Sequence, residues 1–197
     1  MSKLVFYYSG MNAGKSAHLL QKAHNLESKN FFIERFTYRY DNRFGKDKIA
    51  SRIGIEASAK TFSSTTLISK EIAKNCEYIF IDEAQFLSKL QVLDLAEIVD
   101  NAGVNIFCYG LRTDFKGKPF IGSSYLMAWA DEIVEVESYD SYGKKATFNM
   151  RLDKDKKRLW DGKQTEIGLN YESIHRSRFN LRKALGIPDE NAEFDFL

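Results

Sequence analysis

The stretch from Ser9 to Ser16, S-G-M-N-A-G-K-S, combines small residues with a lysine and a hydroxyl, a composition suited to binding phosphate. It follows a short apolar segment that resembles a buried strand and leads into 16–27, where apolar residues recur at helical spacing. Strand, small-residue loop, Lys-Ser and helix are the context of a P-loop. Backbone N–H groups of such a loop surround a phosphate, and the helix N-terminus adds the positive end of its dipole. Lys15 is then expected to reach the outer phosphates and Ser16 to bind Mg²⁺.

The loop departs from the P-loop pattern at one position. The pattern G-x-x-x-x-G-K-[ST] begins with glycine, whereas this chain has Ser9 there and Gly10 next. The alternative interpretation is a glycine-containing turn before an ordinary surface helix. On the P-loop interpretation, the residues that bind the donor phosphates are Ser9, Gly10, Met11, Asn12, Ala13, Gly14, Lys15 and Ser16.

A second candidate for phosphate chemistry is the apolar run 78–81, which ends in Asp82 and Glu83. An acid at the end of a buried strand beside a P-loop holds Mg²⁺ directly or through water, so Ser16 and Asp82 are the expected metal ligands. Glu83 would point to the reacting centre, where a carboxylate can take a proton from an attacking hydroxyl or water. The alternative is that Asp82 caps the next helix and Glu83 is solvated.

The order of elements predicts how these residues come together. Apolar strands are expected at 4–8, 31–37, 78–82, 105–111 and 133–137, and helices at 16–27, 65–74, 87–101 and 122–130. Such alternation predicts an α/β fold, with a mostly parallel sheet flanked by helices. Ligands of these sheets bind beyond the carboxyl ends of the strands. The P-loop, Asp82-Glu83 and 109–114 all fall at such ends.

The remaining segments look different from this core. Residues 38–64 are polar and predict a long loop, which in a compact domain is usually functional or mobile. Residues 138–171 predict a small β appendage, with strands at 146–152 and 158–164, before a final helix at 177–185 and an acidic tail. We therefore expect a P-loop domain at 1–137, a small β subdomain at 138–180 and a helix end with tail at 181–197.

Composition limits the partners. The chain has 197 residues and a formal net charge of +2, which is too balanced to indicate nucleic acid or an anionic membrane as the main partner. No signal pattern and no apolar run of membrane-spanning length are visible. Cys76 and Cys108 lie in or beside apolar runs, as expected of reduced, buried thiols, so we expect a cytoplasmic location.

The nucleophile is not fixed by these motifs. Water would make the chain an ATPase or GTPase, and a bound hydroxyl would make it a kinase. No Asn/Thr-Lys-x-Asp segment reads guanine, and a flat base could bind between aromatic residues near the site. The arginines suited to transition-state charge are Arg43, Arg52 and Arg112, and the aromatic candidates are Phe86, Phe115, Phe120 and Tyr171.

From about Lys3 to Arg176, the chain resembles the type II thymidine kinases. The motifs that carry the resemblance are S-G-M-N-A-G-K-S, Y-D-N-R-F at 40–44, D-E-A-Q-F at 82–86 and Y-G-L-R-T-D-F-K-G-K-P-F at 109–120. The resemblance implies that Asp41 and Arg43 lie near the phosphates and metal and that Glu83 is the general base. The residues it implies for the nucleoside pocket are Met11, Phe86, Leu111, Arg112, Phe115 and Phe120.

The family closes a zinc-held lasso over the nucleoside, and the resemblance extends to Thr165, Ile167, Gly168 and Tyr171, with Tyr171 on the sugar 3′-hydroxyl. Two departures are visible. The lasso tip is shorter than usual, and the positions of the zinc ligands hold Tyr139, Tyr142, His175 and Arg178. Structural zinc requires four Cys or His ligands. We therefore expect no zinc, and an appendage held by Tyr139, Tyr142 and Phe148 with polar contacts from His175 or Arg178.

The function implied by the resemblance is transfer of the ATP γ-phosphoryl to the 5′-hydroxyl of thymidine, with Mg²⁺. Deoxyuridine should also be accepted, whereas deoxycytidine presents the wrong donor-acceptor pattern. Two alternatives are a P-loop ATPase that uses water and a nucleotide-sensing protein without turnover. The resemblance further implies a homotetramer and feedback inhibition by thymidine triphosphate.

Overall fold

The computed structural model describes residues 1–41, 45–164, 170–184 and 186. Its largest sheet consists of β1 Leu4–Ser9, β2 Ile33–Tyr38, β5 Lys60–Phe62, β6 Tyr78–Ile81, β7 Asn105–Leu111 and β8 Glu132–Glu135. These strands lie in the order β5-β2-β6-β7-β1-β8, and each neighbouring pair is parallel. The predicted α/β fold is confirmed.

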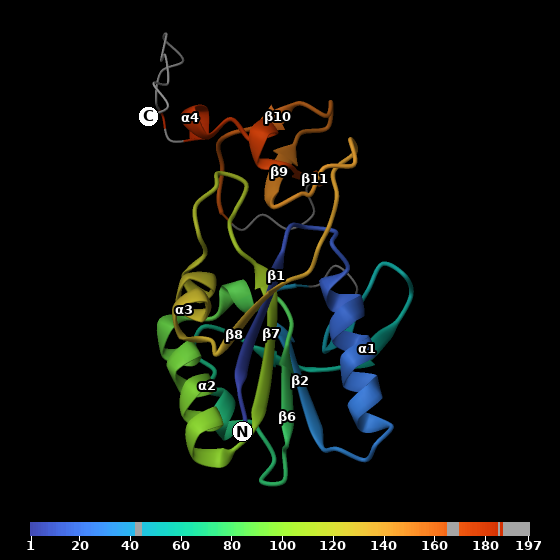
Figure 1. Ribbon diagram of the computed structural model, residues 1–197, viewed down its shortest axis with the longest axis vertical. Coiled ribbons are helices and arrows are strands. Elements are labelled where there is room, and N and C mark those ends of the chain that lie inside the picture. The colour runs from blue at the N-terminus through green and yellow to red at the C-terminus, as the bar shows by residue number, and fades with distance from the viewer. Residues whose placement is uncertain (42–44, 165–169, 185, 187–197) are drawn as a thin grey trace.

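Both faces of this sheet are buried, because successive side chains of a strand point to opposite sides. In β1, Leu4 and Phe6 pack on one side and Val5 and Tyr7 on the other. The long helices are α1 Lys15–Glu27, α2 Lys89–Ala102 and α3 Ile121–Trp129. Figure 1 shows α2 and α3 on one face and α1 on the other. Since all strands run the same way, their carboxyl ends meet at one edge of the sheet.

A capping box fixes the start of α2, and its Gln91 side chain also binds the segment before β6, where a helix was predicted. The Ser88 and Gln91 side chains each accept an N–H from the other residue, and the Gln91 amide also donates to the carbonyls of Ser63 and Thr66. The expected helix at 65–74 is wrong, because this segment contains only the short 3-10 helix η1, Ile68–Lys70. In this segment the Thr66 carbonyl and the Ser69 N–H bond to the α2 side chains of Gln91 and Asp94.

The polar segment 38–64 is more ordered than expected. It forms β3 Lys48–Ala50, β4 Glu56–Ser58 and β5, and β3 pairs with β4 as an antiparallel hairpin. Ile49 is 1% exposed and packs with residues of α1, which anchors the hairpin to the core. Strands of three residues are too short to show an alternating pattern, so sequence periodicity does not reveal them.

The appendage is a three-stranded antiparallel sheet at the carboxyl edge of the large sheet (Figure 1). Its strands are β9 Phe148–Leu152, β10 Arg158–Leu159 and β11 Asn170–Ile174. The first two match predicted strands, whereas β11 was not predicted as one. Arg158 lies 3.5 Å above the Trp160 ring and donates to the Phe179 carbonyl, which ties β10 to the chain after β11.

The base of the appendage is held differently from the prediction. Tyr139 and Tyr142 are 63% and 69% exposed, so neither ring is buried in the appendage as expected. The Tyr142 ring does contact the Arg178 guanidinium, 4.2 Å from its centre. Phe148 does pack, against Ile174 and Phe179.

Asp140 supplies the polar part of this base. Its carboxylate accepts the N–H groups of Tyr142, Lys144 and His175 and lies 3.5 Å from Arg178. The expected polar contact of Arg178 is thus present and is made to Asp140, which the sequence analysis did not single out. His175 contributes its backbone N–H to Asp140, whereas its ring contacts Ser177.

The end of the described chain also differs from the prediction. In place of one helix at 177–185 it has the 3-10 helix η3, Arg176–Arg178, and the short α4, Leu181–Ala184. Asn180, between them, has a left-handed φ of 56°, which breaks the helix. Residue 185 and the predicted acidic tail lie outside the described residues.

Two further expectations concern thiols and membranes. Cys76 and Cys108 are buried and unpaired with each other. Across residues 1–41, 45–164, 170–184 and 186, no helix has both the length and the apolar character needed to cross a membrane.

Candidate active site

The P-loop connects β1 to α1 through residues 10–14. Ser9 is the last residue of β1 and has no left-handed φ, so the missing first glycine costs no backbone strain. Asn12 and Gly14 have φ values of 62° and 78°, and Gly14 is the N-cap of α1. The Lys15 ammonium donates to the Gly10 carbonyl at 2.7 Å, across the mouth of the loop.

Ser16 and Asp82 meet directly. The Ser16 hydroxyl donates to Asp82 Oδ2 at 2.7 Å, although 66 residues separate them in the chain. Burial and then the neighbouring Glu83 charge raise the pKa of Asp82 well above its ordinary value, against the Ser16 hydrogen bond, the Glu83 N–H and the Lys15 charge. The alternative in which Asp82 merely caps a following helix is not what the structure contains, because Asp82 faces the P-loop.

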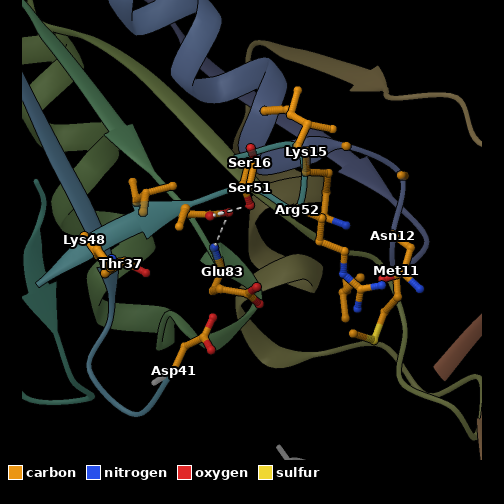
Figure 2. Close-up of a pocket in the computed structure, with 18 of the residues that line it drawn as sticks. Met11, Asn12, Lys15, Ser16, Thr37, Asp41, Lys48, Ser51, Arg52 and Glu83 are labelled. Carbon is orange, nitrogen blue, oxygen red and sulfur yellow. Dashed lines mark hydrogen bonds between the residues drawn. The ribbon is translucent and has the colours of Figure 1, made fainter. Parts of the chain in front are cut away.

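Glu83 follows in an uncommon backbone conformation. Its φ is 55°, the left-handed region, and its N–H donates to Asp82 Oδ1 at 3.0 Å (Figure 2). Strain of this kind in a residue with a side chain is typical of functional positions. Gln85 donates to the Glu83 carboxylate and accepts the Leu111 N–H at 3.0 Å, so Gln85 links the acid to the end of β7.

A pocket of about 180 Å³ is lined by Lys15, Ser16, Asp82, Glu83 and Leu111. The β3–β4 hairpin forms the opposite wall, and Arg52 from its turn lines the pocket together with Lys15. In the view of Figure 2, Arg52 lies toward Met11 and Asn12, whereas Glu83 and Asp41 lie on the other side. The pocket therefore brings the cationic Lys15, Lys48 and Arg52 together with the carboxylates of Asp41, Asp82 and Glu83.

An aromatic group lies next to the acids. Phe86 ends the short helix η2, Ala84–Phe86, and contacts Phe120 edge-on, with ring centroids 5.8 Å apart. Tyr38 covers Phe86 at 4.3 Å. Phe115 is 1% exposed and lies under the Arg151 guanidinium, 3.8 Å from its ring centre.

Arg151 also holds the chain that leads toward residue 165. Its guanidinium donates to the carbonyls of Asp161 and Lys163, and Gln164 donates to Asp114 at 3.1 Å. The segment 161–164 is thus fixed beside Phe115.

Ser16 and Asp82 fit a hard divalent cation. Both offer oxygen, they are already in contact, and Mg²⁺ commonly uses one or two protein oxygens with substrate phosphates and water. Where the resemblance implies zinc ligands, the chain has Tyr139, Tyr142, His175 and Arg178, and this set lacks the four Cys or His ligands of structural zinc. Tyr139 and Tyr142 are exposed and Arg178 is paired with Asp140. No group of three or more His, Cys, Asp or Glu suited to a metal occurs among the described residues.

The predicted site residues divide into three sets. Those that line the pocket are Met11, Asn12, Ala13, Gly14, Lys15, Ser16, Asp41, Asp82, Glu83 and Leu111. Those that are described but do not line it are Ser9, Gly10, Phe86, Arg112, Phe115, Phe120 and Tyr171. Arg112 lies between the rings of Tyr8 and Phe148. Those outside the described residues are Arg43, Thr165, Ile167 and Gly168.

Sequence reasoning missed residues that support the site. Gln85 lies within the D-E-A-Q-F motif, so its position next to Glu83 could have indicated a role in the site. Asn149, Arg151 and Ser173 belong to the appendage strands and have no local signal, because their partners are far away in the chain.

Comparison with known proteins identifies the family. The sequence profile described as thymidine kinase matches residues 2–179. A thymidine kinase of Shewanella oneidensis is 46% identical over 188 residues, which cover 91% of this chain and 97% of the relative. One of Xanthomonas campestris pv. campestris is 45% identical over 191 residues, covering 94% and 91%. One of Salmonella choleraesuis is 40% identical over 190 residues, covering 94% and 93%. With a match over nearly its whole length and a phosphate loop facing two acids, this chain belongs to the thymidine kinase family.

Proposed function

We propose that this chain transfers the γ-phosphoryl of ATP to the 5′-hydroxyl of thymidine, and of deoxyuridine, with Mg²⁺ as the divalent cation. The observation that carries the proposal is the contact of Ser16 with Asp82, next to Glu83 and in one pocket with Lys15. Family membership favours this reaction over the alternatives of a water-using ATPase or a sensor without turnover.

The P-loop holds the donor. Amides of 9–16 and the Lys15 ammonium bind the triphosphate, and Asp41 lies at its edge. When bound to Ser16 and Asp82, Mg²⁺ neutralises charge on the phosphate oxygens. Arg43 and Arg112 are proposed to steady the transferring group, and Arg52 joins them as a residue that lines the pocket.

Glu83 is the proposed general base. Its carboxylate takes the proton of the 5′-hydroxyl as that oxygen attacks the γ-phosphorus of ATP, and the bond from this phosphorus to the β,γ-bridging oxygen breaks to release ADP. The hydrogen bond from Gln85 fixes the orientation of the carboxylate before the alcohol binds. A carboxylate held in place loses no rotational freedom during the reaction.

The nucleoside binds between the P-loop and the appendage. We propose that its pocket is formed by Met11, Phe86, Leu111, Arg112, Phe115, Phe120, Thr165, Ile167, Gly168 and Tyr171. The contact of Phe86 with Phe120 supports an aromatic wall next to the proposed base.

The remaining proposals concern the whole molecule. We propose a P-loop domain at 1–137 and a β subdomain at 138–180, a cytoplasmic homotetramer, feedback inhibition by thymidine triphosphate and no bound zinc. Exposed Leu90, Ile121 and Trp129 on α2 and α3 support an assembly through that face. One tightly held zinc per chain in purified protein would contradict the last proposal.

The test measures ATP consumption with thymidine, deoxyuridine, deoxycytidine or no nucleoside. Thymidine and deoxyuridine should stimulate turnover, and deoxycytidine should not. Glu83→Gln should lower kcat by about 10²–10⁴-fold with thymidine binding retained. Glu97→Gln, an exposed position on α2, is the matched control. Nucleoside-independent hydrolysis, or efficient phosphorylation of deoxycytidine, would contradict the proposal.

A further inference from the structure

Met11 in the P-loop is held by the appendage through both of its backbone polar groups. Its N–H donates to Asn149 Oδ1 at 2.7 Å, and its carbonyl accepts the Ser173 hydroxyl. Asn149 lies on β9 and Ser173 on β11, directly opposite each other in the strand pairing. One cross-strand pair of the small sheet therefore hydrogen-bonds to one residue of the phosphate loop.

Asn149 also reaches the other wall of the site. Its amide Nδ2 donates to the Thr113 carbonyl at 3.1 Å, and the residue is 2% exposed. An N–H on one side and a carbonyl on the other require an acceptor and a donor in one side chain, which an amide provides. Asn149 thus joins the P-loop to the segment 111–120 that leads to Phe115 and Phe120.

The fit at this contact is tight. A Cβ at Gly10 would lie 2.6 Å from Ser173 Oγ and 3.3 Å from Asn149 Oδ1, so β11 approaches the loop too closely for a side chain there. A further contact, from the Asn12 amide to the Tyr171 carbonyl at 3.3 Å, lies on the same strand. The conformation of residues 10–12 therefore depends on where the appendage sits.

We propose that Asn149 and Ser173 are positioning residues that couple the two substrate sites. The proposal rests on the proposed function, because that function assigns the nucleoside to the appendage. Asn149 and Ser173 already hold Met11 without a ligand, so a nucleoside that stabilises the appendage in this position also stabilises the conformation of the phosphate loop, and thymidine tightens nucleotide binding. Coupling between two binding sites is reciprocal, so the nucleotide tightens thymidine binding by the same factor.

The experiment measures binding of the β,γ-imido analogue of ATP, with Mg²⁺, by calorimetry without and with saturating thymidine. In the wild-type protein we expect thymidine to tighten analogue binding by at least about fivefold, the lower range of allosteric coupling. Ser173→Ala should bring this factor close to one. Asn149→Asp, which keeps an acceptor for Met11 N–H and loses the donor to Thr113, should also lower it.

Ser138→Ala is the matched control. Ser138 is half-buried like Ser173, but its hydroxyl donates to Ala146 within the appendage, away from the P-loop. In Ser138→Ala, thymidine should tighten analogue binding by the same factor as in the wild-type protein. Affinity for thymidine alone should stay within about threefold in Ser173→Ala, because the nucleoside walls are unchanged.

Two results would overturn the coupling. One is a factor of one in the wild-type protein, and the other is an unchanged factor in a folded Ser173→Ala variant. Either result, obtained with a protein that phosphorylates thymidine, leaves the proposed function standing. A wild-type protein that binds neither thymidine nor the analogue would refute the proposed function itself.

Discussion

The carboxyl edge of the large sheet (the rim) and the appendage above it meet at the P-loop but are built in different ways. The rim takes Ser16, Asp82 and Glu83 from the ends of strands or the start of a helix, over a core that fills both faces of the sheet. The appendage has a small core of Phe148, Ile174 and Phe179. A large apolar core fixes the backbone that carries the site residues. The appendage has only a small core, so hydrogen bonds from polar side chains to backbone groups must hold it in place.

One polar device recurs outside the rim. In three turns, an aspartate oxygen accepts the N–H groups of the residues two and four positions later, while the fourth residue of the turn has a left-handed φ. The aspartates are Asp114, Asp140 and Asp153, and the left-handed residues are Gly117, Gly143 and Lys156. The same five-residue turn thus stiffens the loop beside the site, the base of the appendage and the β9–β10 connection.

The largest expected effect is a loss of activity without a loss of thermal stability, on substitution of Asp82 at the carboxyl edge of the large sheet. Asp82→Asn keeps an acceptor for Ser16 but removes the charge, so we expect phosphorylation of thymidine to fall by at least about 100-fold. Because burial disfavours the Asp82 carboxylate, the thermal midpoint should stay the same or rise. Steady-state kinetics and calorimetry check this pair of outcomes. A large drop in the midpoint would mean that Asp82 stabilises the fold rather than the metal.

The next effect should appear in the appendage. Arg151→Met removes the guanidinium that covers Phe115 and binds two carbonyls, and hydrogen bonds from charged groups contribute about 1.5–3 kcal/mol each. We expect KM for thymidine to rise about tenfold or more, with KM for ATP nearly unchanged. KM for thymidine of Arg151→Lys should lie between those of the wild type and Arg151→Met. Equal rises in both constants would contradict the assignment of Arg151 to the nucleoside side.

Asp140 provides an acid-dependent test of the base of the appendage. Burial works to raise its pKa, but the N–H groups of Lys144, Tyr142 and His175 and the Arg178 charge outweigh burial and hold the pKa below its ordinary value of 3.8. The stabilisation is therefore complete above the unfolded-state pKa and lost as pH falls below it. The protection of the β9 and β11 amides, which is the exchange rate corrected for the intrinsic rate at each pH, should fall under acid in the wild-type protein. Asp140→Asn should exchange faster already at neutral pH, and Asp100→Asn, at an exposed position of α2, should match the wild type.

The smallest effect concerns the third turn. Lys156 adopts φ of 61°, a conformation that strains residues with a side chain. Lys156→Gly should raise the free energy of unfolding by about 0.5–1 kcal/mol, seen as a slightly higher thermal midpoint. Lys154→Gly, in the same turn with an ordinary φ, should lower it instead. A lower midpoint for Lys156→Gly would show that its side chain outweighs the strain.

The rim could be predicted from sequence because its signals are local. The P-loop and the run ending in Asp82-Glu83 each occupy a few consecutive residues, and a parallel sheet brings strand ends together without further information. The fold class and most strands of the large sheet follow from the same alternation. The hairpin of 48–58 was missed, since its strands are too short to display a period.

The supports of the site could not be read in this way. Asn149 and Ser173 contact Met11 across 138 and 162 residues of sequence, and a polar residue in a short strand resembles one that faces solvent. Asp140 was not predicted, because its partners His175 and Arg178 are distant in sequence and an aspartate before a turn resembles one that faces solvent. Tertiary contact, rather than local preference, decides these positions.

The stacking of Arg158 on Trp160 has a practical consequence. The chain contains two tryptophans, Trp129 on α3 and Trp160 beside β10. Trp129→Phe leaves a lone indole fluorophore in the appendage, whose emission is sensitive to the guanidinium 3.5 Å away. In this variant, the indole emission therefore reports whether Trp160 keeps its contact with Arg158 of β10, without a second indole signal from α3.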